Sequence, residues 1–212
     1  MIGRNEGERL KAGLRALAQS CPECLVVYVD SGSTDDSVTF ARSNDLPVVE
    51  LDMSVPFTAA RARNAGFARL LELRPDLEFV QFLDGDCTVD PDWPAAAISA
   101  LQRDPKIAVV SGRRMEQHPD SSVFNTLMDI EWNTPVGETK AVLGDMCVRT
   151  DVFRQVNGFQ EDIISSEDFD ICLRIRRAGY SIHRIGHKMS DHDANITRIS
   201  QWYKRSMRAG YG

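Results

Sequence analysis

The spacing of apolar residues along the chain switches repeatedly between that of a helix and that of a strand. Leu10, Leu14 and Leu17 recur at helical spacing and predict a helix over 8–20. Apolar runs separated by helical segments predict strands over 25–30, 46–51, 77–83 and 107–111. Strands that alternate with helices predict an α/β fold, with a mostly parallel sheet flanked by helices on both faces.

The second half of the chain is less regular. Helices are predicted over 121–132, 150–156, 165–178 and 197–208, and strands over 140–149 and 180–185. No linker, repeat or low-complexity segment interrupts the pattern, so residues 1–212 are predicted to form a single domain. Met1-Ile2-Gly3 is too short for a first strand, and the chain stops abruptly after Tyr211-Gly212. We therefore expect a domain that is truncated at both ends.

The composition is that of an ordinary globular protein, and it narrows the choice of partner. A net charge of −6 leaves no basic surplus to neutralise phosphates, which argues against nucleic-acid binding. Five scattered cysteines, an odd number, suggest reduced thiols and a cytoplasmic protein. Cys21 and Cys24 form a CxxC without a second CxxC at zinc-finger spacing, so a zinc or redox site is disfavoured. The sequence contains no apolar run long enough to span a bilayer.

The most informative motif is Asp84-Gly85-Asp86, which closes the strand predicted over 77–83. Ligands of open α/β sheets bind outside the carboxyl ends of the strands, so both carboxylates stand where chemistry is expected. Such a pair suits Mg²⁺ or Mn²⁺, which also accept water and substrate phosphate as ligands. Gly85 carries no side chain that would block a phosphate-bearing ligand. Because an isolated motif of this kind is more often a simple turn, other residues must decide between turn and site.

Polar residues follow other predicted strands at the same edge of a parallel sheet. Asp30 and Ser31 end one strand and can hydrogen-bond a nucleobase or ribose, although an aspartate there is also a common turn residue. Arg61 and Arg63 lie about 200° apart on the helix opened by Pro56, so only one of them can face the site. We expect Arg63 to face it and to contact a base or phosphate, with a salt-bridged helix surface as the alternative.

Two later motifs supply further candidates. Glu167 and Asp168 open a helix, where the helix dipole favours acidic residues whatever their function. An ionised Asp168 at the mouth of a cleft can take a proton from an incoming hydroxyl. His192 follows the last strand between two aspartates and is a suitable Mn²⁺ ligand beside a carboxylate pair, with an ordinary surface histidine as the alternative.

The last predicted helix combines basic residues with Trp202 and Tyr203. Arg205 on this helix can neutralise a diphosphate. The same basic-aromatic face could instead make peripheral contact with a membrane, or the helix could be an ordinary one.

In order and spacing, these motifs resemble those of the family 2 glycosyltransferases, which have the GT-A fold. The resemblance covers nearly the whole chain and rests on Arg4-Asn5-Glu6-Gly7, Val29-Asp30-Ser31-Gly32-Ser33, Ala62-Arg63-Asn64-Ala65-Gly66, Asp84-Gly85-Asp86, Gly158-Phe159 and Glu167-Asp168. It implies a Rossmann-like GT-A domain that takes a nucleotide-diphosphate sugar, such as a UDP- or GDP-sugar, together with Mn²⁺ or Mg²⁺. It further implies inverting transfer to a hydroxyl acceptor in bacterial cell-envelope polysaccharide biosynthesis.

The resemblance gives the amino-terminal motifs a role in donor binding. Asn5, Glu6 and Asp30 would hold the base and ribose, with Arg63 near the base or diphosphate. Asp84 would bind the ribose or the metal. Residues 1–115 would then form the nucleotide-sugar-binding half of the domain, and residues 116–212 the acceptor-binding and catalytic half.

The resemblance places metal ligation and catalysis on different motifs. Asp86 would bind the metal, and His192 is similar to a late metal-binding histidine of some GT-A enzymes. Asp168 matches the catalytic base of the family, with Glu167 beside it.

The chain also departs from the family pattern. Many relatives have Gly-Gly-Asn where this chain has Leu143-Gly144-Asp145, so we expect Asp145 to read an acceptor hydroxyl. Trp132 could stack on that sugar, with a buried core tryptophan as the alternative. Gln201-Trp202-Tyr203-Lys204-Arg205 only loosely matches the Q-x-x-R-W motif of processive synthases, which argues against polymerisation. The first strand is nearly missing, which would leave the sheet short of a partner strand.

Two other classes of protein share parts of this pattern. A nucleotidyltransferase that forms a sugar nucleotide shares this kind of sheet and the same reason for a metal ion bound by carboxylates. Such enzymes usually carry a Gly-rich loop with an arginine after the first strand, which Arg4-Asn5-Glu6-Gly7 does not match. A non-catalytic module that only binds a sugar nucleotide is the other alternative, and the presence of Asp84, Asp86 and Asp168 together argues against it.

Overall fold

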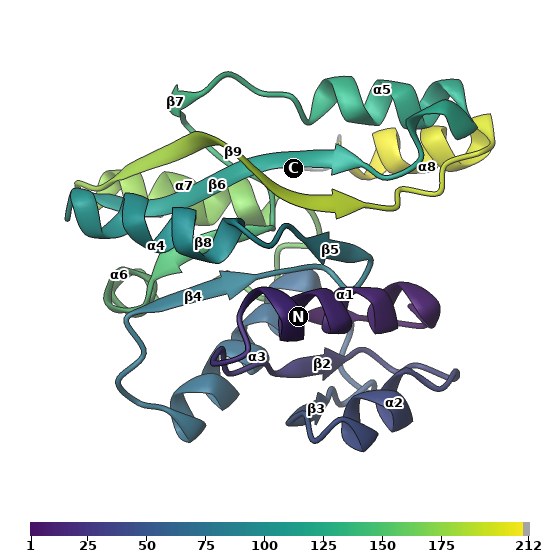
Figure 1. Cartoon of the computed structure of the whole chain (residues 1–212), viewed down its shortest axis with the longest axis horizontal. Helices are drawn as coiled ribbons and strands as arrows, with labels where there is room; N and C mark the ends of the chain where they lie inside the picture. The colour runs from purple at the N-terminus through teal and green to yellow at the C-terminus, as the bar shows by residue number, and fades with distance from the viewer. Residues whose placement is uncertain (210–212) are drawn as a thin grey trace.

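The computed structural model describes residues 1–209, in which strands and helices form an α/β arrangement (Figure 1). The first part alternates as predicted, through β1 (Ile2–Gly3), α1 (Glu8–Ser20), β2 (Tyr28–Asp30), α2 (Ser37–Ser43), β3 (Val48–Glu50), α3 (Ala59–Leu73) and β4 (Phe79–Phe82). The second part consists of β5 (Cys87–Val89), α4 (Trp93–Arg103), β6 (Ile107–Glu116), α5 (Val123–Glu131), β7 (Gly137–Glu138), β8 (Met146–Arg149), α6 (Thr150–Gln155), α7 (Glu167–Arg177), β9 (Ser181–His192) and α8 (Ile199–Ala209). A single 3-10 turn, Pro119–Ser121, precedes α5.

The two-residue strand β1 connects the two groups of strands by hydrogen bonds on both of its sides. It pairs in parallel with β2, and β2 pairs in parallel with β3. On its other side, the backbone N–H of Ile2 donates to the carbonyl of Leu83 just beyond β4, at 3.0 Å. The expectation that Met1-Ile2-Gly3 is too short for a strand was therefore wrong, because hydrogen bonds to a neighbour on each side fix it as one.

The second sheet has the strand order β4-β8-β6-β9-β5, with β7 paired to β9. β6 and β9 run parallel, whereas β8 is antiparallel to both β4 and β6, and β5 is antiparallel to β9. The predicted α/β fold is confirmed. The first sheet, β1–β3, is wholly parallel, whereas the second sheet is mixed, because β6 and β9 pair in parallel while β8 lies antiparallel between β4 and β6.

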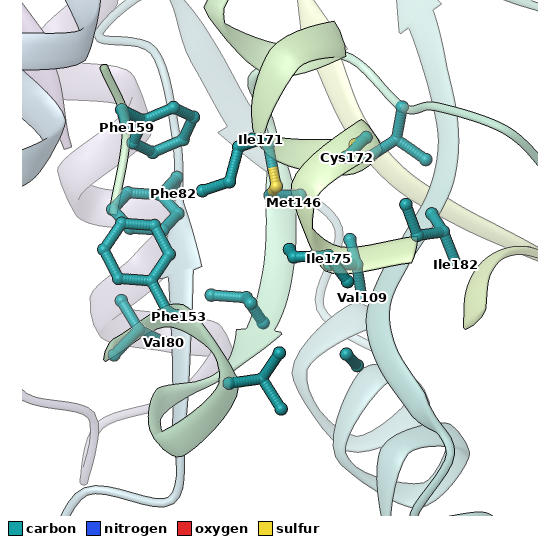
Figure 2. Close-up of a cluster of buried hydrophobic side chains, with 14 of the residues drawn as sticks. Val80, Phe82, Val109, Met146, Phe153, Phe159, Ile171, Cys172, Ile175 and Ile182 are labelled. Atoms are coloured by element: carbon teal, nitrogen blue, oxygen red, sulfur yellow. The ribbon is translucent and has the colours of Figure 1, made fainter. Parts of the chain in front are cut away.

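Helices cover both faces of the second sheet. Phe153 of α6 and Ile171 and Ile175 of α7 pack on one face, together with Phe82 of β4 (Figure 2). Trp93, Ala97 and Leu101 of α4 pack on the opposite face, and they are also fully or almost fully buried. Burial of one large apolar side chain contributes about 1.5–3 kcal/mol to the free energy of unfolding. The two helical layers together therefore fix the positions of the strands and of the residues at their ends.

The cysteines differ from the sequence-based expectation. Cys21 and Cys24 are joined by a disulfide, so the expectation of reduced thiols was wrong for this pair; the turn between them brings their Cα atoms to 5.3 Å, which suits a disulfide. Cys87, Cys147 and Cys172 are free and buried. Within residues 1–209, no helix has both the length and the apolar content needed to cross a bilayer.

An apolar cavity of about 350 Å³ lies between β2 and β4, at the ends of these strands where they begin. The strand predicted over 25–30 is paired only from Tyr28 onward. The residues before it, Leu25, Val26 and Val27, line the cavity instead.

Candidate active site

The Asp84-Gly85-Asp86 motif forms the turn between β4 and β5, where β1 approaches β4. Ile2 and Asp84 make an isolated parallel bridge, so the turn packs against the backbone of β1. A Cβ atom on Gly85 would lie 2.8 Å from Cγ of Glu6 and 3.0 Å from the carbonyl oxygen of Ile2. The expected reason for Gly85 was therefore wrong. A glycine is needed here because the chain itself fills the space that was expected to admit a phosphate.

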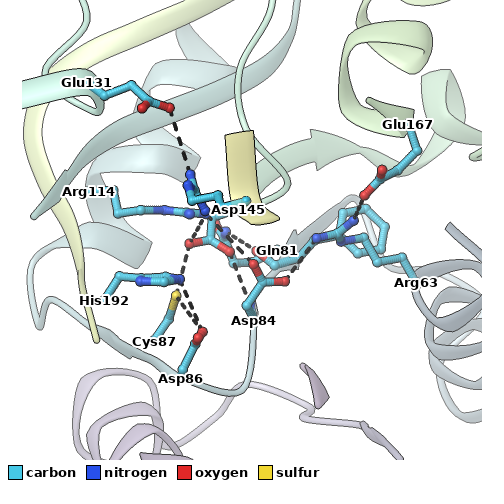
Figure 3. Close-up of polar contacts among 12 residues, drawn as sticks. Arg63, Gln81, Asp84, Asp86, Cys87, Arg114, Glu131, Asp145, Glu167 and His192 are labelled. Carbon is cyan, nitrogen blue, oxygen red and sulfur yellow. Dashed lines mark hydrogen bonds and ion pairs between the residues drawn. The ribbon is translucent and has the colours of Figure 1, made fainter. Parts of the chain in front are cut away.

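Arg63, buried on α3, joins the two acidic motifs. Its Nη1 donates to Oε1 of Glu167 at 2.5 Å, and its Nη2 donates to Oδ1 of Asp84 at 2.9 Å (Figure 3). Arg61 is turned away and donates instead to the main-chain carbonyls of Val55 and Pro56. Of the two arginines, Arg63 is thus the one that faces the acidic residues. Its contacts in this structure are carboxylates, so a contact with a base or phosphate stays a prediction.

A second buried arginine, Arg114 on β6, lies on the other side of Asp84. Its Nη2 is 2.6 Å from Oδ2 of Asp145 and 4.0 Å from Oδ2 of Asp84 (Figure 3). The sequence reasoning missed this residue because the predicted strand ended at residue 111, whereas β6 continues through Arg114 to Glu116. Glu167, Arg63, Asp84, Arg114 and Asp145 therefore form one line of alternating charges across the strand ends.

Asp145 belongs to the interior of this line. Its carboxylate accepts hydrogen bonds from the backbone N–H of Asp84 at 3.1 Å and from the thiol of Cys87 at 3.1 Å, and none of its side chain is exposed. The predicted role of Asp145 in acceptor binding was therefore wrong. The residue supports the Asp84–Asp86 turn from inside the protein.

The charge line changes how readily its members ionise. Burial opposes ionisation of Asp84, but Arg63 and Arg114 together hold the pKa of that carboxyl below its usual value. Pairing of this kind offsets the cost of partly burying the carboxylate, whose side chain is 29% exposed. Asp84 thus faces two guanidinium groups in this structure, at 2.9 Å from Arg63 and 4.0 Å from Arg114, and its contact with a metal or a ribose stays a prediction.

One acid of each motif has no such partner. Among the described residues, neither Asp86 nor Asp168 has an arginine or lysine nitrogen within ion-pair distance. Burial, together with the nearby Asp84, raises the pKa of Asp86 to about 7. Burial and the neighbouring Glu167 raise the pKa of Asp168 to about 6. Carboxylates with a pKa near neutrality are typical of proton acceptors and ligand sites.

Asp86 and His192 fit a divalent cation. Together with Cys87 they offer ligand atoms that all lie within 4.8 Å of one another, and Nε2 of His192 is 3.3 Å from Oδ1 of Asp86 (Figure 3). Burial, helped by Arg114, lowers the pKa of His192 to about 3, so its imidazole is neutral and keeps a lone pair for a metal. Burial raises the pKa of the Cys87 thiol well above its usual value, which makes Cys87 a poor ligand for a hard cation.

The loops that follow β1 and β2 meet at the same sheet edge, as the sequence predicts. The backbone N–H of Asn5 donates to Oγ of Ser33 at 2.9 Å, and Oδ1 of Asn5 accepts from the backbone N–H of Thr34 at 2.7 Å. Asp30 accepts from the backbone N–H groups of Gly32 and Ser33 and from the hydroxyl of Tyr28. The Asp30 carboxylate therefore shapes its own turn, which was the alternative left open for it.

The two other residues expected to bind the donor are also enclosed. Glu6 pairs with Arg9 at 2.8 Å, and burial raises the pKa of the Glu6 carboxyl. Ser31 is buried, and its hydroxyl has no hydrogen-bond partner among the described residues. An unpartnered buried hydroxyl beside the two loops is a group that a ligand could satisfy.

Trp132 directly follows α5 and lies against His192, one of the candidate metal ligands. Its ring centroid is 4.8 Å from that of His192, and the guanidinium groups of Arg114 and Arg205 lie 5.4 and 5.8 Å from its ring centroid. Only 3% of the residue is exposed. The buried core tryptophan is therefore the alternative that the structure supports, and an acceptor sugar has no free ring face to stack on. Arg205 is also 3.8 Å from Glu131, and its contact with a diphosphate stays a prediction.

Curated proteins with similar sequences are glycosyltransferases. The pre-mycofactocin glycosyltransferase of Mycobacterium tuberculosis (strain ATCC 25618 / H37Rv) is 28% identical over 95% of this chain and 43% of that protein. The O-antigen chain rhamnosyltransferase WbaN of Salmonella anatum is 24% identical over 81% of this chain and 57% of that protein. In both alignments, the chain accounts for less than two thirds of the relative's length.

Solved structures confirm the fold. The structure of Staphylococcus aureus TarS residues 1–349 superposes with a TM-score of 0.70 at 16% identity, covering 96% of this chain and 61% of that one. The mannosyltransferase PcManGT from Pyrobaculum calidifontis, in complex with GDP-Man and Mn²⁺, superposes with a TM-score of 0.62 at 20% identity, covering 89% of this chain and 54% of that one. Both likenesses support a single GT-A domain.

The sequence also matches a family model directly. The model described as glycosyl transferase family 2 covers residues 1–157, which include β1 to β8, Arg63, the Asp84–Asp86 turn and Arg114. This span is well over half of the chain. The predicted family is therefore confirmed, and the chain belongs to glycosyl transferase family 2.

Proposed function

We propose that this chain is the catalytic domain of a metal-dependent, inverting glycosyltransferase, which moves a sugar from a nucleotide-diphosphate sugar to a hydroxyl acceptor. The observation that carries the proposal is that Arg63 forms an ion pair with one acid of each acidic motif. This arginine neutralises Asp84 and Glu167 and leaves Asp86 and Asp168 free, one for the donor and one for the acceptor.

The donor would bind at the edge formed by β1, β2 and the Asp84–Asp86 turn. In this proposal, Asn5, Glu6, Asp30 and Ser31 shape the base and ribose pocket, and residues 1–115 form the donor half of the domain. A UDP- or GDP-sugar is supported by structural neighbours whose solved complexes contain UDP in one case and GDP-Man in the other. Those complexes belong to other proteins with the same fold.

The proton transfer would fall to Asp168, at the start of α7. As the acceptor oxygen attacks the anomeric carbon, Asp168 takes the hydroxyl proton, and the bond from that carbon to the diphosphate oxygen breaks on the opposite side. The sugar is thereby inverted and the nucleoside diphosphate leaves. A carboxyl with a pKa of about 6 is mostly ionised at neutral pH yet basic enough to accept a proton during the attack.

Asp86 and His192 would hold the divalent cation, Mn²⁺ or Mg²⁺. A bound cation of this kind supplies positive charge for the diphosphate as it leaves. The fit rests on one free carboxylate oxygen and one neutral imidazole nitrogen, which lie 3.3 Å apart. The remaining ligands would come from water and from the donor.

The acceptor would lie beside residues 116–212. We place it in bacterial cell-envelope polysaccharide or lipid-linked glycan synthesis, by analogy with relatives named as an O-antigen rhamnosyltransferase and a poly-β-1,6-N-acetyl-D-glucosamine synthase. The working location would be the cytoplasm. The basic residues of α8, Arg205 among them, would neutralise the diphosphate or touch the membrane surface that carries such an acceptor.

A thermal-shift screen of nucleoside diphosphates, with and without Mn²⁺, tests the donor half of this proposal. We expect one base to raise the melting temperature selectively and only when Mn²⁺ is present, because a ligand that binds only the folded state stabilises it by mass action. Indifference to every nucleotide with Mn²⁺ present would contradict the proposal. Release of pyrophosphate from a nucleoside triphosphate and a sugar 1-phosphate would identify the sugar-nucleotide-forming class instead.

A further inference from the structure

The segment that joins β9 to α8, residues 193–197, has no regular secondary structure but is closely held. The backbone N–H of Ala194 donates to Oε2 of Glu116 at 3.0 Å, and the backbone N–H of Ile196 donates to Oδ1 of Asn125 at 3.0 Å. Glu116 ends β6 and Asn125 belongs to α5. Side chains from two other elements therefore fix the backbone just beyond the end of β9.

Glu116 and Asn125 are themselves buried and bonded to each other. Only 3% of Glu116 and 1% of Asn125 are exposed. Nδ2 of Asn125 donates to Oε1 of Glu116 at 3.1 Å, and the same oxygen accepts from the backbone N–H of His118 at 3.0 Å. Because loss of one partner would leave another buried polar group without its bond, the pair holds one defined arrangement. We call this pair the Glu116–Asn125 clasp.

The face of α5 that supplies Asn125 also packs on the segment beyond β9. Asn125 and Met128 of α5 and Trp132 directly after it recur at intervals of three and four residues, so they lie on one face. Met128 and Trp132 form one buried cluster with Ile196. Figure 1 shows α5 and α8 close to the end of β9. The clasp and this apolar cluster thus hold the same segment against α5.

His192, the last residue of β9, depends on such support because its second ring nitrogen is not held. Its Nδ1 is buried and has no hydrogen-bond partner among residues 1–209. In metal-binding histidines, the nitrogen that faces away from the metal usually donates a hydrogen bond that fixes the ring. Here the ring packs edge to face on Trp132, with 4.8 Å between the centroids. The orientation of the imidazole toward Asp86 therefore depends on this packing and on the backbone that carries it.

Backbone hydrogen bonds connect the clasp to that imidazole. Glu116 lies opposite His192 in the pairing of β6 with β9. The backbone N–H of Gln117 donates to the carbonyl of His192 at 2.9 Å, and that of Asp193 donates to the carbonyl of Asp86 at 3.3 Å. The backbone around the imidazole is therefore held by β6, by the clasp and by the turn that contains Asp86.

We propose that Glu116 and Asn125 are positioning residues, which keep Nε2 of His192 directed toward Asp86 so that both can bind one divalent cation. The inference rests on the cation site of the proposed function. The role is indirect, because the clasp bonds the backbone beyond His192, whereas the atoms that would bind the cation belong to His192 and Asp86. Residues that orient a metal ligand in this indirect way typically contribute about 10–100-fold to metal affinity.

The test measures Mn²⁺ binding, in the presence of UDP or of GDP, to the original chain and to the variants Asn125→Ala, Glu116→Gln and Thr126→Ala. Thr126 is the matched control. It follows Asn125 on α5 but is exposed, and its hydroxyl donates to the carbonyls of Pro119 and Ser122. Glu116→Gln keeps the size of the side chain and replaces one acceptor oxygen by a donor. It therefore serves as a second disruption of the clasp if Asn125→Ala does not fold.

The Kd of Mn²⁺ should rise at least about tenfold in Asn125→Ala and Glu116→Gln and stay unchanged in Thr126→Ala. The free Mn²⁺ is measured by its electron paramagnetic resonance signal. Nucleotide binding without Mn²⁺ should be the same in all four chains, which general damage to the fold would not permit. Hydrogen exchange at the amide of Ile196 should accelerate in Asn125→Ala, because its acceptor is lost. The amide of Ile182, near the start of β9, is the internal control.

Mn²⁺ affinities in Asn125→Ala and Glu116→Gln equal to that of the original chain would overturn the proposal. An equal loss of nucleotide binding with and without Mn²⁺ would do the same, because damage to the whole fold predicts that result. Failure of the original chain to bind Mn²⁺ with either nucleotide would refute the cation site of the proposed function, and the positioning role with it. The behaviour of the original chain therefore separates the two kinds of failure.

Discussion

The two acidic motifs of the site share one arginine, and the comparison between them explains how similar residues take different roles. Arg63 pairs with the first acid of each motif, Asp84 and Glu167. The second acid of each, Asp86 and Asp168, has no arginine or lysine in ion-pair contact among the described residues. Each motif thus contains one acid that holds the structure together and one that is free for chemistry.

The free acids differ in their surroundings. Asp86 lies beside the neutral imidazole of His192, whereas Asp168 lies in the first turn of α7, where a backbone N–H at 2.9 Å is its hydrogen-bond donor. A carboxylate beside a neutral nitrogen ligand suits a cation, and a carboxylate in the first turn of a helix with a pKa near neutrality suits proton transfer. The contacts of the two free acids therefore favour different roles for them, although both are aspartates.

The largest expected effect comes from Asp168→Asn. Without a base, sugar transfer should fall by about 10²–10⁴-fold, which is the usual contribution of a general base. Binding of the nucleotide with Mn²⁺ should stay close to that of the original chain, because Asp86 and His192 are untouched. Steady-state transfer assays and nucleotide titrations measure the two quantities separately. Equal loss of transfer and of binding would show that Asp168 is part of the donor site.

Removal of the shared arginine should damage both motifs at once. Arg63→Met leaves Asp84 and Glu167 without their buried partner, and breaking a buried pair costs about 3–5 kcal/mol in the free energy of unfolding. Arg69→Met on the exposed side of the same helix is the matched control, since its pair with Glu72 is exposed and worth about 0–1 kcal/mol. Urea denaturation measures both. A cost for Arg63→Met as small as that of the control would refute the shared-arginine arrangement.

A smaller and more selective effect is expected from changing the proposed metal ligand Asp86. Asp86→Ala should abolish the extra stability that Mn²⁺ gives to the nucleotide complex, which amounts to about 2.7 kcal/mol at a ligand concentration of 100 times Kd. Asp84→Asn should retain the Mn²⁺ dependence, because Asp84 faces Arg63 and Arg114 instead of His192. Thermal shifts with and without Mn²⁺ distinguish the variants. Loss of the Mn²⁺ effect in Asp84→Asn with retention in Asp86→Ala would reverse the assignment.

Much of this comparison was accessible from the sequence because its signals are local. An apolar strand followed by Asp84-Gly85-Asp86, and a helix that begins at Glu167, mark the two motifs without knowledge of the sheet. Helical geometry also predicted that only one of Arg61 and Arg63 can face the site, and the residues that follow Arg63, Asn64 and Gly66, favoured Arg63. The family resemblance then connected the separate motifs, and the family model confirms it over residues 1–157.

The parts that the sequence did not reveal depend on contacts between distant segments. Asp145 and Arg114 meet only because β8 inserts antiparallel between β4 and β6, a pairing for which local periodicity has no signal. The strand at Ile2–Gly3 is too short for any pattern and exists because neighbours on both sides bond to it. The sequence marked Gly85 correctly as a position that needs a glycine, but the reason inferred from it was wrong. Only the packing of β1 shows that the chain itself fills the space beside this glycine.

The smallest expected effect is a change of pH dependence that tests whether Glu167 tunes Asp168. Asp168 must be ionised to accept a proton, so transfer should fall about tenfold for each pH unit below its pKa of about 6 and level off above it. Burial is the main reason for this raised pKa, and the charge of Glu167 is the second. Glu167→Gln removes that charge and frees Arg63 to act more strongly on Asp168. Both changes favour the ionised form, so the midpoint of the pH–rate profile should move to lower pH while the plateau rate changes little. A midpoint that stays fixed or moves to higher pH would mean that Glu167 affects transfer only by holding Arg63 in place.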